Sequence, residues 1–428
     1  MFKRLSPRFD SQGEIPLDRN RTGGDGVCMW LVWGTFIISR ALLLFAQWFV
    51  VPESGGTDVA LYARYAKDQQ LASRQGQTVF HVRAFEYPPL AIIPMVAPSW
   101  FITPDAYEDR VSKEYLQKYR ALYRLEMALC EMLCFACLLA LTAKGFPEES
   151  GREHLERALV FVLSGLLLGS IVHTRLDIML MLLIILSLWL LLSQRHYFWS
   201  FVLLSAAIVF KFVPIILVPI WILSSLPHRV FIGARKKRVV LRLIKLCGLR
   251  LLLFIILVIG WILPFYILAG NRVFMFFDFL KTRGIEVSTS YGSIIAWCKQ
   301  WGLPLEVYSS HSSMDVRNSF SLQLVEAAPW LVGGLWLIAV AVLIVTYMRI
   351  DQRNATSHTQ KAHPGSRCRP ALTAFTLVFF LILIIFNKVL SPQYLLWLGP
   401  LVPLMPLKHR RARRVYRFSN LGAKENRP

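Results

Sequence analysis

The stretch LRLLLFIILVIGWILPFYILA, residues 249–269, contains a single charged residue, Arg250. Such a run is long enough to cross the hydrocarbon core of a bilayer, for which about 20 apolar residues suffice. Residues 27–51 and 329–348 form similar runs. The chain of 428 residues is 55% hydrophobic and only 17% charged, which is more apolar surface than a soluble domain can bury. The sequence therefore predicts an all-α polytopic membrane protein.

Positive charge is concentrated in a few segments of this chain, whose net charge is +22. The basic segments are the N-terminal arm, RKKRVVLRLIK (235–245), the stretch 349–369 and KHRRARRVYR (408–417). Basic loops between apolar spans mark the cytoplasmic side and attract anionic lipid headgroups. This pattern favours membrane lipids over nucleic acid as the partner of these charges.

The apolar runs predict ten transmembrane helices. They lie near 28–51, 88–102, 121–143, 158–172, 177–193, 200–224, 249–269, 327–348, 371–387 and 391–407. With the N-terminus inside, every strongly basic loop is also inside, and the two long loops 52–87 and 270–326 are outside. The expected organisation is a basic cytoplasmic arm (1–27), a transmembrane domain (28–407) and a basic cytoplasmic tail (408–428).

Two acidic residues stand in the first outer loop. Asp58 follows two glycines and opens the stretch DVALYARYAKDQQLASR, which reads as a short interfacial helix. In RAFEYPPLAIIPM (83–95), Glu86 and Tyr87 precede two prolines, which hold the chain extended at the membrane boundary. Either acid also has a purely structural explanation, because carboxylates cap helices and favour their N-terminal ends.

The order of several motifs resembles the GT-C superfamily of integral-membrane glycosyltransferases, with the strongest likeness to glycosyltransferase family 87 and a more distant one to glycosylphosphatidylinositol mannosyltransferase I. The motifs are TDVALYARYA (57–66), FEYPPLAIIPM (85–95), TRLDIMLMLLIILSLWL (174–190), FKFVPIILVPIWIL (210–223), LKTRGIEVSTSYGSI (280–294) and NKVLSPQYLLWLGPLVPL (387–404). Where such enzymes usually carry an acid, this chain has Ser288, so the likeness fixes the substrate less closely than the fold.

The resemblance implies a bundle of about ten helices and a catalytic base at Asp58. It implies transfer of mannose or another hexose from a polyprenyl-phosphate donor to a lipid or glycan acceptor, outside a bacterial cytoplasmic membrane. No cofactor or metal is expected, and the seven cysteines have no metal-binding spacing. The residues expected to bind the donor phosphate or substrate are Glu86, Tyr87, Arg175, Asp177, Lys211, Arg283, Lys388, Gln393 and Tyr394.

Cations in or beside apolar spans fit an anionic lipid-linked donor. Lys211 lies midway through a predicted span, where a charge is costly and indicates function. Lys388 serves equally well as an interfacial anchor, and Arg283 as a solvated loop residue. Tyr394, beside Gln393, is also an ordinary interfacial tyrosine.

Arg175 and Asp177, in HTRLD (173–177), are the hardest residues to place. The count of spans puts them at the cytoplasmic end, away from Asp58. The flanking spans are short, so the turn could instead lie inside the membrane and line a cavity. A neutralised structural pair at a cytoplasmic turn is an equal alternative.

A transporter or flippase of lipid-linked or anionic substrates is the alternative function. Transporters often show internal repeats with paired broken helices, and none is evident in this sequence.

Overall fold

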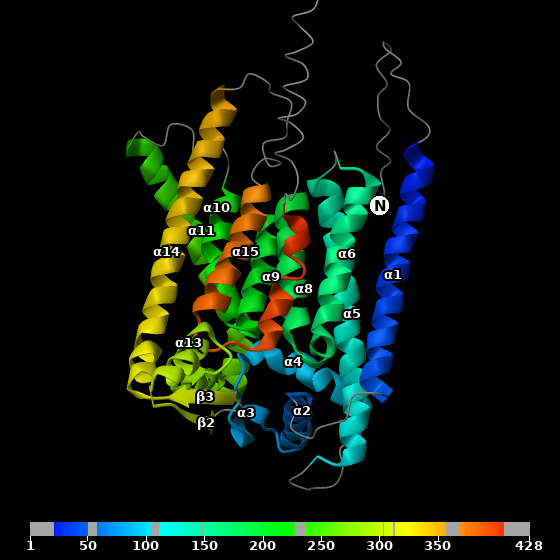
Figure 1. Cartoon of the computed structure of the whole chain (residues 1–428), viewed down its shortest axis with the longest axis vertical. Helices are drawn as coiled ribbons and strands as arrows, with labels where there is room; N and C mark the ends of the chain where they lie inside the picture. The colour runs from blue at the N-terminus through cyan, green and yellow to red at the C-terminus, as the bar shows by residue number, and fades with distance from the viewer. Residues whose placement is uncertain are drawn as a thin grey trace, which may run out of the picture.

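The protein is a bundle of helices with a few short segments across one end (Figure 1). The computed structural model describes residues 21–49, 58–103, 111–146, 149–194, 196–226, 237–302, 304–310, 313–356 and 369–405. The tail 408–428, most of the arm 1–27 and the two glycines before Asp58 lie outside these residues. Four helices of the described chain are long and apolar enough to cross a membrane: Met29–Gln47, Lys113–Gly145, Val240–Thr282 and Ser319–Arg349. They confirm a helical membrane protein; the number of crossings stays a prediction.

Long and medium helices run along the axis of the bundle. They are α1 (Arg21–Phe49), α5 (Lys113–Gly145), α6 (Gly151–Leu168), α8 (Asp177–Trp189), α9 (Tyr197–Phe210), α10 (Val218–Ser225), α11 (Lys237–Ala269), α14 (Ser319–Thr356) and α15 (Arg369–Phe386). Shorter helices connect them: α2 (Asp58–Arg74), α3 (Val79–Val82), α4 (Ile92–Val96), α7 (Ile171–Thr174), α12 (Phe276–Thr282) and α13 (Ser290–Cys298).

Contacts between distant segments define two ends of the bundle. At the Asp58 end, the side chain of Asp58 pairs with Arg175, and α5 begins where the Tyr115 hydroxyl donates to Gln70 of α2. At the Arg157 end, the guanidinium of Arg157 donates hydrogen bonds to the carbonyls of Pro403 and Met405.

The predicted span 200–224 is in fact two helices that fold back at Lys211. The backbone of Lys211 is extended, and the indole of Trp221 in α10 donates to the hydroxyl of Ser200 in α9 at 3.0 Å. Pro214 has no N–H for a helical bond to the preceding turn, and this ends α9. Lys211 therefore lies at the tip of a hairpin at the Asp58 end, and not in the middle of a helix.

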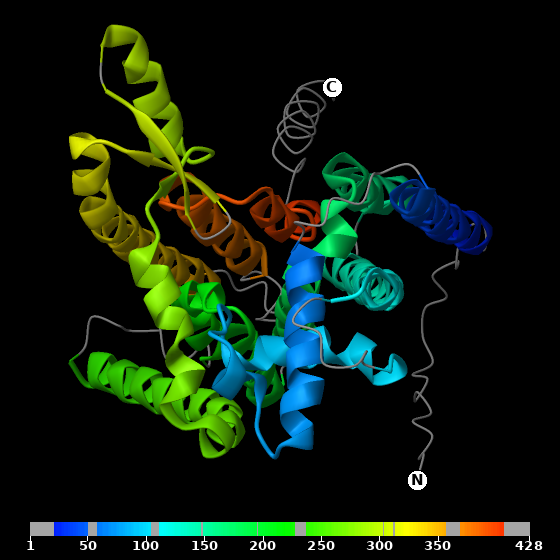
Figure 2. The ribbon, with the colours of Figure 1, turned by 90° about the horizontal axis from the view of Figure 1, so that it is seen from below.

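The predicted span 88–102 is broken and lies across the helix ends. It consists of α4 between two 3-10 turns, η1 (Pro89–Ala91) and η2 (Ala97–Phe101). Figures 1 and 2 show α4 and α2 passing over the Asp58 end instead of along the bundle axis. Prolines at 88, 89, 94 and 98 remove backbone donors over the whole segment, so one continuous helix cannot form.

The loop predicted at 270–326 contains a small sheet. Its strands are β1 (Ile285–Glu286), β2 (Glu306–Ser310) and β3 (Ser313–Arg317), antiparallel in the order β1-β3-β2. Helix α13 packs on it through a separate apolar cluster that includes Ile285 and Ile295. A methyl group at Gly292 would lie 2.4 Å from the Glu286 carbonyl oxygen, so only glycine lets α13 approach β1 this closely.

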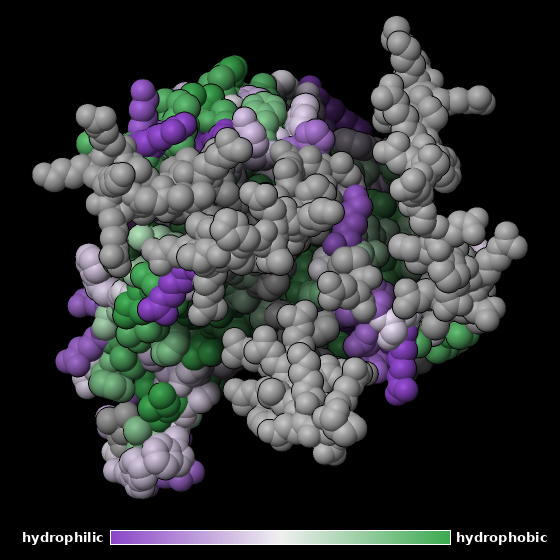
Figure 3. Space-filling view, turned by 90° about the horizontal axis from the view of Figure 1, so that it is seen from above, coloured by the Kyte–Doolittle hydropathy of each residue, from purple (hydrophilic) through white to green (hydrophobic). Residues whose placement is uncertain are grey.

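Apolar side chains remain exposed along the flanks of the bundle. Leu241, Ile259 and Ile267 of α11 and Trp330 of α14 are examples. Hydrophobic residues also lie between hydrophilic patches in the space-filling view from above (Figure 3). Apolar surface of this extent on helices of membrane length is the surface that lipid covers.

Candidate active site

Asp58 and Arg175 form an ion pair at the Asp58 end of the bundle. Asp58 is the first residue of α2, and Arg175 follows the single turn of α7. Their side chains are 25% and 28% exposed, so the pair is accessible from one side. Of the two alternatives for Arg175 and Asp177, the one that follows from the count of spans, a turn away from Asp58, is wrong. The count of spans included the segment 88–102, which runs across the helix ends, and this inverted the position of the following turns.

Asp177 and Lys211 form a second ion pair beside the first. Asp177 opens α8 and Lys211 ends α9, and these helices are antiparallel neighbours. The Lys211 Nζ donates to Asp177 Oδ1 at 2.6 Å, and the Trp397 indole donates to the same oxygen at 2.7 Å. Asp177 is only 1% exposed. The charge of Asp177 also acts on Arg175, which links the two pairs electrostatically.

Two aromatic rings cover the ammonium group of Lys211. The Nζ atom lies 5.4 Å from the ring centres of both Tyr394 and Trp397, which are stacked 4.3 Å apart. Both rings come from the 3-10 helix η8 (Pro392–Trp397). A cation over aromatic faces is held by the ring quadrupole. Tyr394 was predicted from the sequence and Trp397 was not, although a spacing of three residues places both on one helical face.

Gln393, also predicted, lies in the same 3-10 helix. Its side-chain Oε1 is buried and accepts no hydrogen bond within the described part of the chain. A buried acceptor without a donor is unfavourable unless a ligand or water supplies one. Gln393 is therefore a candidate for contact with a substrate hydroxyl.

Arg283 and Lys388 meet where the small sheet joins the bundle. The Lys388 ammonium donates to the Arg283 carbonyl oxygen at 2.7 Å. Glu286 of β1 accepts a hydrogen bond from the Leu390 amide at 3.0 Å, and its own amide donates to the Lys388 carbonyl. The hydroxyl of Ser288 donates to the Leu390 carbonyl at 2.6 Å.

These contacts bring the charges of Arg283, Glu286 and Lys388 together. The charge of Arg283 acts on Glu286, Lys388 and Tyr394. Burial raises the pKa of the Glu286 carboxyl and lowers the pKa of the Lys388 ammonium from their ordinary values. Glu286 lies within the motif LKTRGIEVSTSYGSI but was not predicted as a site residue.

Glu86 and Tyr87 lie beside α2. The Tyr87 hydroxyl is 3.3 Å from the hydroxyl of Tyr62 in α2, and the charge of Asp177 acts on both phenols. Burial and the nearby Glu86 raise the pKa of Tyr87. Tyr123 of α5 packs on Tyr62, and its buried hydroxyl has no hydrogen-bond partner among the described residues. Tyr62 and Tyr123 were not predicted; a tyrosine alone carries no signal that distinguishes a site from a core.

The site thus combines an accessible acid with cations and aromatic rings. Within the described ranges, no group of three or more His, Cys, Asp or Glu residues is placed to hold a metal ion. The carboxylate of Asp58 is available for proton transfer, and the cations offer partners for an anion. Comparisons of the chain with protein-family models, with curated proteins and with solved structures found no match.

Proposed function

We propose that the protein is an integral-membrane glycosyltransferase that takes a hexose such as mannose from a polyprenyl-phosphate donor. The acceptor is a lipid or a glycan at the membrane surface. The sequence likeness to family 87 of the GT-C superfamily suggests the reaction. The observation that carries the proposal is the position of Asp58, which stands with Arg175 beside the Asp177–Lys211 pair at one end of an apolar bundle.

Asp58 acts as the general base of this reaction. Its carboxylate removes the proton of an acceptor hydroxyl as that oxygen attacks the anomeric carbon of the sugar. General base catalysis contributes about 10²–10⁴-fold to a rate. Arg175 keeps the carboxylate ionised and oriented, because an opposite charge in contact favours the charged form.

The cations stabilise the group that leaves. As the bond between the anomeric carbon and the phosphate oxygen breaks, the polyprenyl phosphate gains one negative charge. The Lys211 ammonium lies over the stacked Tyr394 and Trp397 rings, and the charge of Arg283 acts on Tyr394. In this proposal these two cations attract that charge together with Lys388, which donates to the Arg283 carbonyl. Fixed positive groups aimed at developing charge are the strongest form of electrostatic catalysis. Glu86, Tyr87 and Gln393 are the residues proposed to hydrogen-bond the sugar or the acceptor.

The Asp58 end faces outward in this proposal. Lys245 and Arg250 lie in the first half of α11, whose Arg250 stacks on Tyr197 at the start of α9, toward the Arg157 end. Basic segments prefer the cytoplasmic side, so the Arg157 end would be cytoplasmic. The chain would then pass the membrane several times, with its site open to the outer surface.

Transfer by the purified protein tests the proposal directly. The full-length protein in lipid is given radiolabelled polyprenyl-phosphate mannose and a lipid extract as acceptor, and products are identified by mass spectrometry. Formation of a new glycoconjugate together with free polyprenyl phosphate supports the proposal. Movement of the intact donor between the leaflets of a vesicle, with no new glycosidic bond, would instead establish the flippase alternative.

A further inference from the structure

A second polar cluster lies deep in the bundle, behind the site. Arg40 of α1 donates to Oε1 of Glu131 in α5 through Nε (2.9 Å) and Nη2 (2.6 Å). The other oxygen of Glu131, Oε2, is 3.0 Å from Nε2 of His173 in α7. The His173 Nδ1 atom faces the side-chain nitrogen of Gln47 at 3.4 Å. The cluster thus joins three helices through consecutive contacts.

Every member of the cluster is removed from solvent. Glu131 is 1% exposed and His173 is fully buried. Arg40 makes a further hydrogen bond to the Val162 carbonyl at 2.9 Å. Charged groups inside an apolar bundle are costly even when paired, and apolar residues often hold helices together equally well. Helix association alone therefore does not explain this cluster.

The contacts of His173 engage both ring nitrogens. Nε2 lies 3.0 Å from Oε2 of Glu131, and Nδ1 lies 3.4 Å from the side-chain nitrogen of Gln47. A polar partner at each nitrogen fixes the orientation of the ring. A fixed ring fixes α7, because this helix is a single turn.

Helix α7, which His173 holds in place, is followed directly by Arg175, the ion-pair partner of Asp58. Arg175 is two residues beyond His173 and directly follows α7. A single helical turn has little stability of its own, so its position depends on side-chain contacts.

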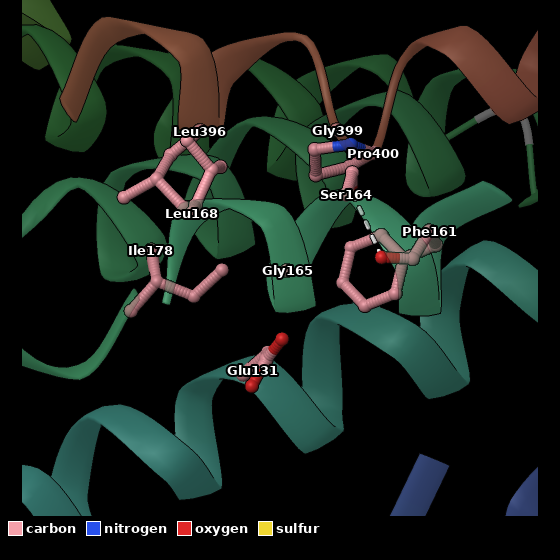
Figure 4. Close-up of a pocket in the computed structure, with 9 residues that line it drawn as sticks. All are labelled: Glu131, Phe161, Ser164, Gly165, Leu168, Ile178, Leu396, Gly399 and Pro400. Carbon is pink, nitrogen blue, oxygen red and sulfur yellow. Dashed lines mark hydrogen bonds between the residues drawn. The ribbon is translucent and has the colours of Figure 1, made fainter. Parts of the chain in front are cut away.

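A small pocket lies between Glu131 and the residues next to Asp177 and Trp397. It is lined by Glu131, Phe161, Ser164, Gly165, Leu168, Ile178, Leu396, Gly399 and Pro400 (Figure 4). Leu396 precedes Trp397, the donor to Asp177, and Ile178 follows Asp177. A methyl group at Gly165 would clash with Nη2 of Arg40, so a larger residue there would require the guanidinium beside Glu131 to shift.

We infer that Glu131 and His173 are positioning residues that hold Arg175 against Asp58. This inference rests on the proposed function for its effect on turnover, but not for its structural content. Loss of the His173 contact would let α7 and Arg175 shift, and a displacement of about 1 Å in a catalytic group costs about 100-fold in rate.

The test compares His173→Ala and His173→Gln in the full-length protein. The glutamine amide reaches about as far as histidine Nε2 and still donates to Glu131, so His173→Gln should keep most activity. His173→Ala should lower kcat about 10- to 100-fold with a smaller change in KM for the donor. Amide hydrogen exchange of residues 170–177 should become several-fold faster in His173→Ala and stay near wild type in His173→Gln.

Glu149→Gln provides the matched control. Glu149 and Arg157 form a buried ion pair of 2.6 Å at the opposite end, with side chains 7% and 8% exposed. This variant should lose stability without faster exchange in 170–177. An unchanged exchange rate there in His173→Ala, or an equal fall in kcat in Glu149→Gln at equal loss of Tm, would overturn the inference. If the wild type transfers no sugar, the proposed function fails, and the exchange measurement still decides the positioning role.

Discussion

The ammonium group of Lys211 is held 2.6 Å from the buried carboxylate of Asp177, where two antiparallel helices end together. Because the Trp397 indole donates to the same oxygen, Asp177 is satisfied by two donors and its position is fixed. Lys211 is in turn covered by the Tyr394 and Trp397 rings. The same contacts thus hold the lysine in place and surround its charge. An experiment has to separate its role in binding the phosphate from its role in stabilising the fold.

Lys211→Ala should impair both stability and turnover. Removing one partner of a buried ion pair leaves an uncompensated charge and costs about 3–5 kcal/mol of unfolding free energy. Lys211→Arg keeps the charge and should keep part of the activity. The double variant Lys211→Met with Asp177→Asn removes both charges and should recover most of the lost stability. Thermal unfolding and transfer rates are measured on the three variants and the wild type at equal membrane abundance.

The double variant separates the two roles of Lys211. If the lysine binds the leaving phosphate, the double variant should remain inactive although it is stable. Recovery of activity together with stability would show that Lys211 serves the fold alone.

Asp58→Asn should abolish transfer while the protein still folds. Asparagine caps a helix about as well as aspartate, and a partly exposed ion pair contributes about 0–1 kcal/mol. Loss of the base should lower kcat about 10²–10⁴-fold. Asp58→Glu should also be nearly inactive, because the extra methylene displaces the carboxylate. Single-turnover transfer from a polyprenyl-phosphate sugar measures the effect.

Asp68→Asn is the control on the same helix. Asp68 pairs with Arg83 at 2.5 Å and has a similar exposure, but it contacts none of the proposed catalytic residues. It should retain a transfer rate close to wild type. A rate near wild type in Asp58→Asn would remove Asp58 from catalysis and favour a transporter.

Cysteine labelling should place Lys113 and Arg152 on opposite sides of the membrane. Lys113 starts α5 near α2, at the Asp58 end, whereas Arg152 lies in the first turn of α6 at the Arg157 end. An impermeant thiol reagent added outside should label Lys113→Cys and Gln300→Cys, and miss Arg152→Cys and a cysteine at 235–238. Labelling of Arg152→Cys from outside would contradict the proposed orientation.

Transfer should weaken at alkaline pH as Lys388 loses its proton. Burial lowers the pKa of Lys388 below the ordinary lysine value, so its charge is lost at a lower pH than in a free lysine. The folded protein then binds this proton less tightly than the unfolded chain, so unfolding free energy from this group rises with pH in that window. A fall in kcat there therefore reports lost charge, not unfolding.

Lys388→Arg should move the alkaline limb of the kcat profile upward, because arginine stays protonated. Lys281→Arg, on the exposed side of α12, is the control and should leave the profile unchanged. An identical profile in wild type and Lys388→Arg would exclude Lys388 from phosphate binding.

The sequence predicted the class of fold better than its connections. Apolar runs are local features, so the long helices α1, α5, α11 and α14 follow from composition. The segments 88–102 and 200–224 have the same apolar character, yet one lies across the helix ends and the other folds back at Lys211. Prolines in both segments disfavour a continuous helix, but hydropathy does not predict the direction in which the chain continues after the break.

In the candidate site, too, the sequence predicted single residues but not the contacts between them. The sequence marked Asp58, Arg175, Asp177 and Lys211, because charged residues beside apolar runs are costly enough to be noticed. It could not pair Lys211 with Asp177, add Trp397, or assign Arg175 to Asp58. Arg40 and Glu131 also lie in predicted spans, where a charge is costly, but they were not predicted as functional residues.

By itself, then, the sequence determined that this chain is a helical membrane protein and which polar residues are costly to bury. Both follow from the transfer free energy of each residue between water and an apolar medium, which depends on local composition. Only the tertiary structure decided which of these residues share one end of the bundle and which form the cluster behind it. Those contacts depend on helix direction and packing between segments far apart in the chain, which no local pattern encodes.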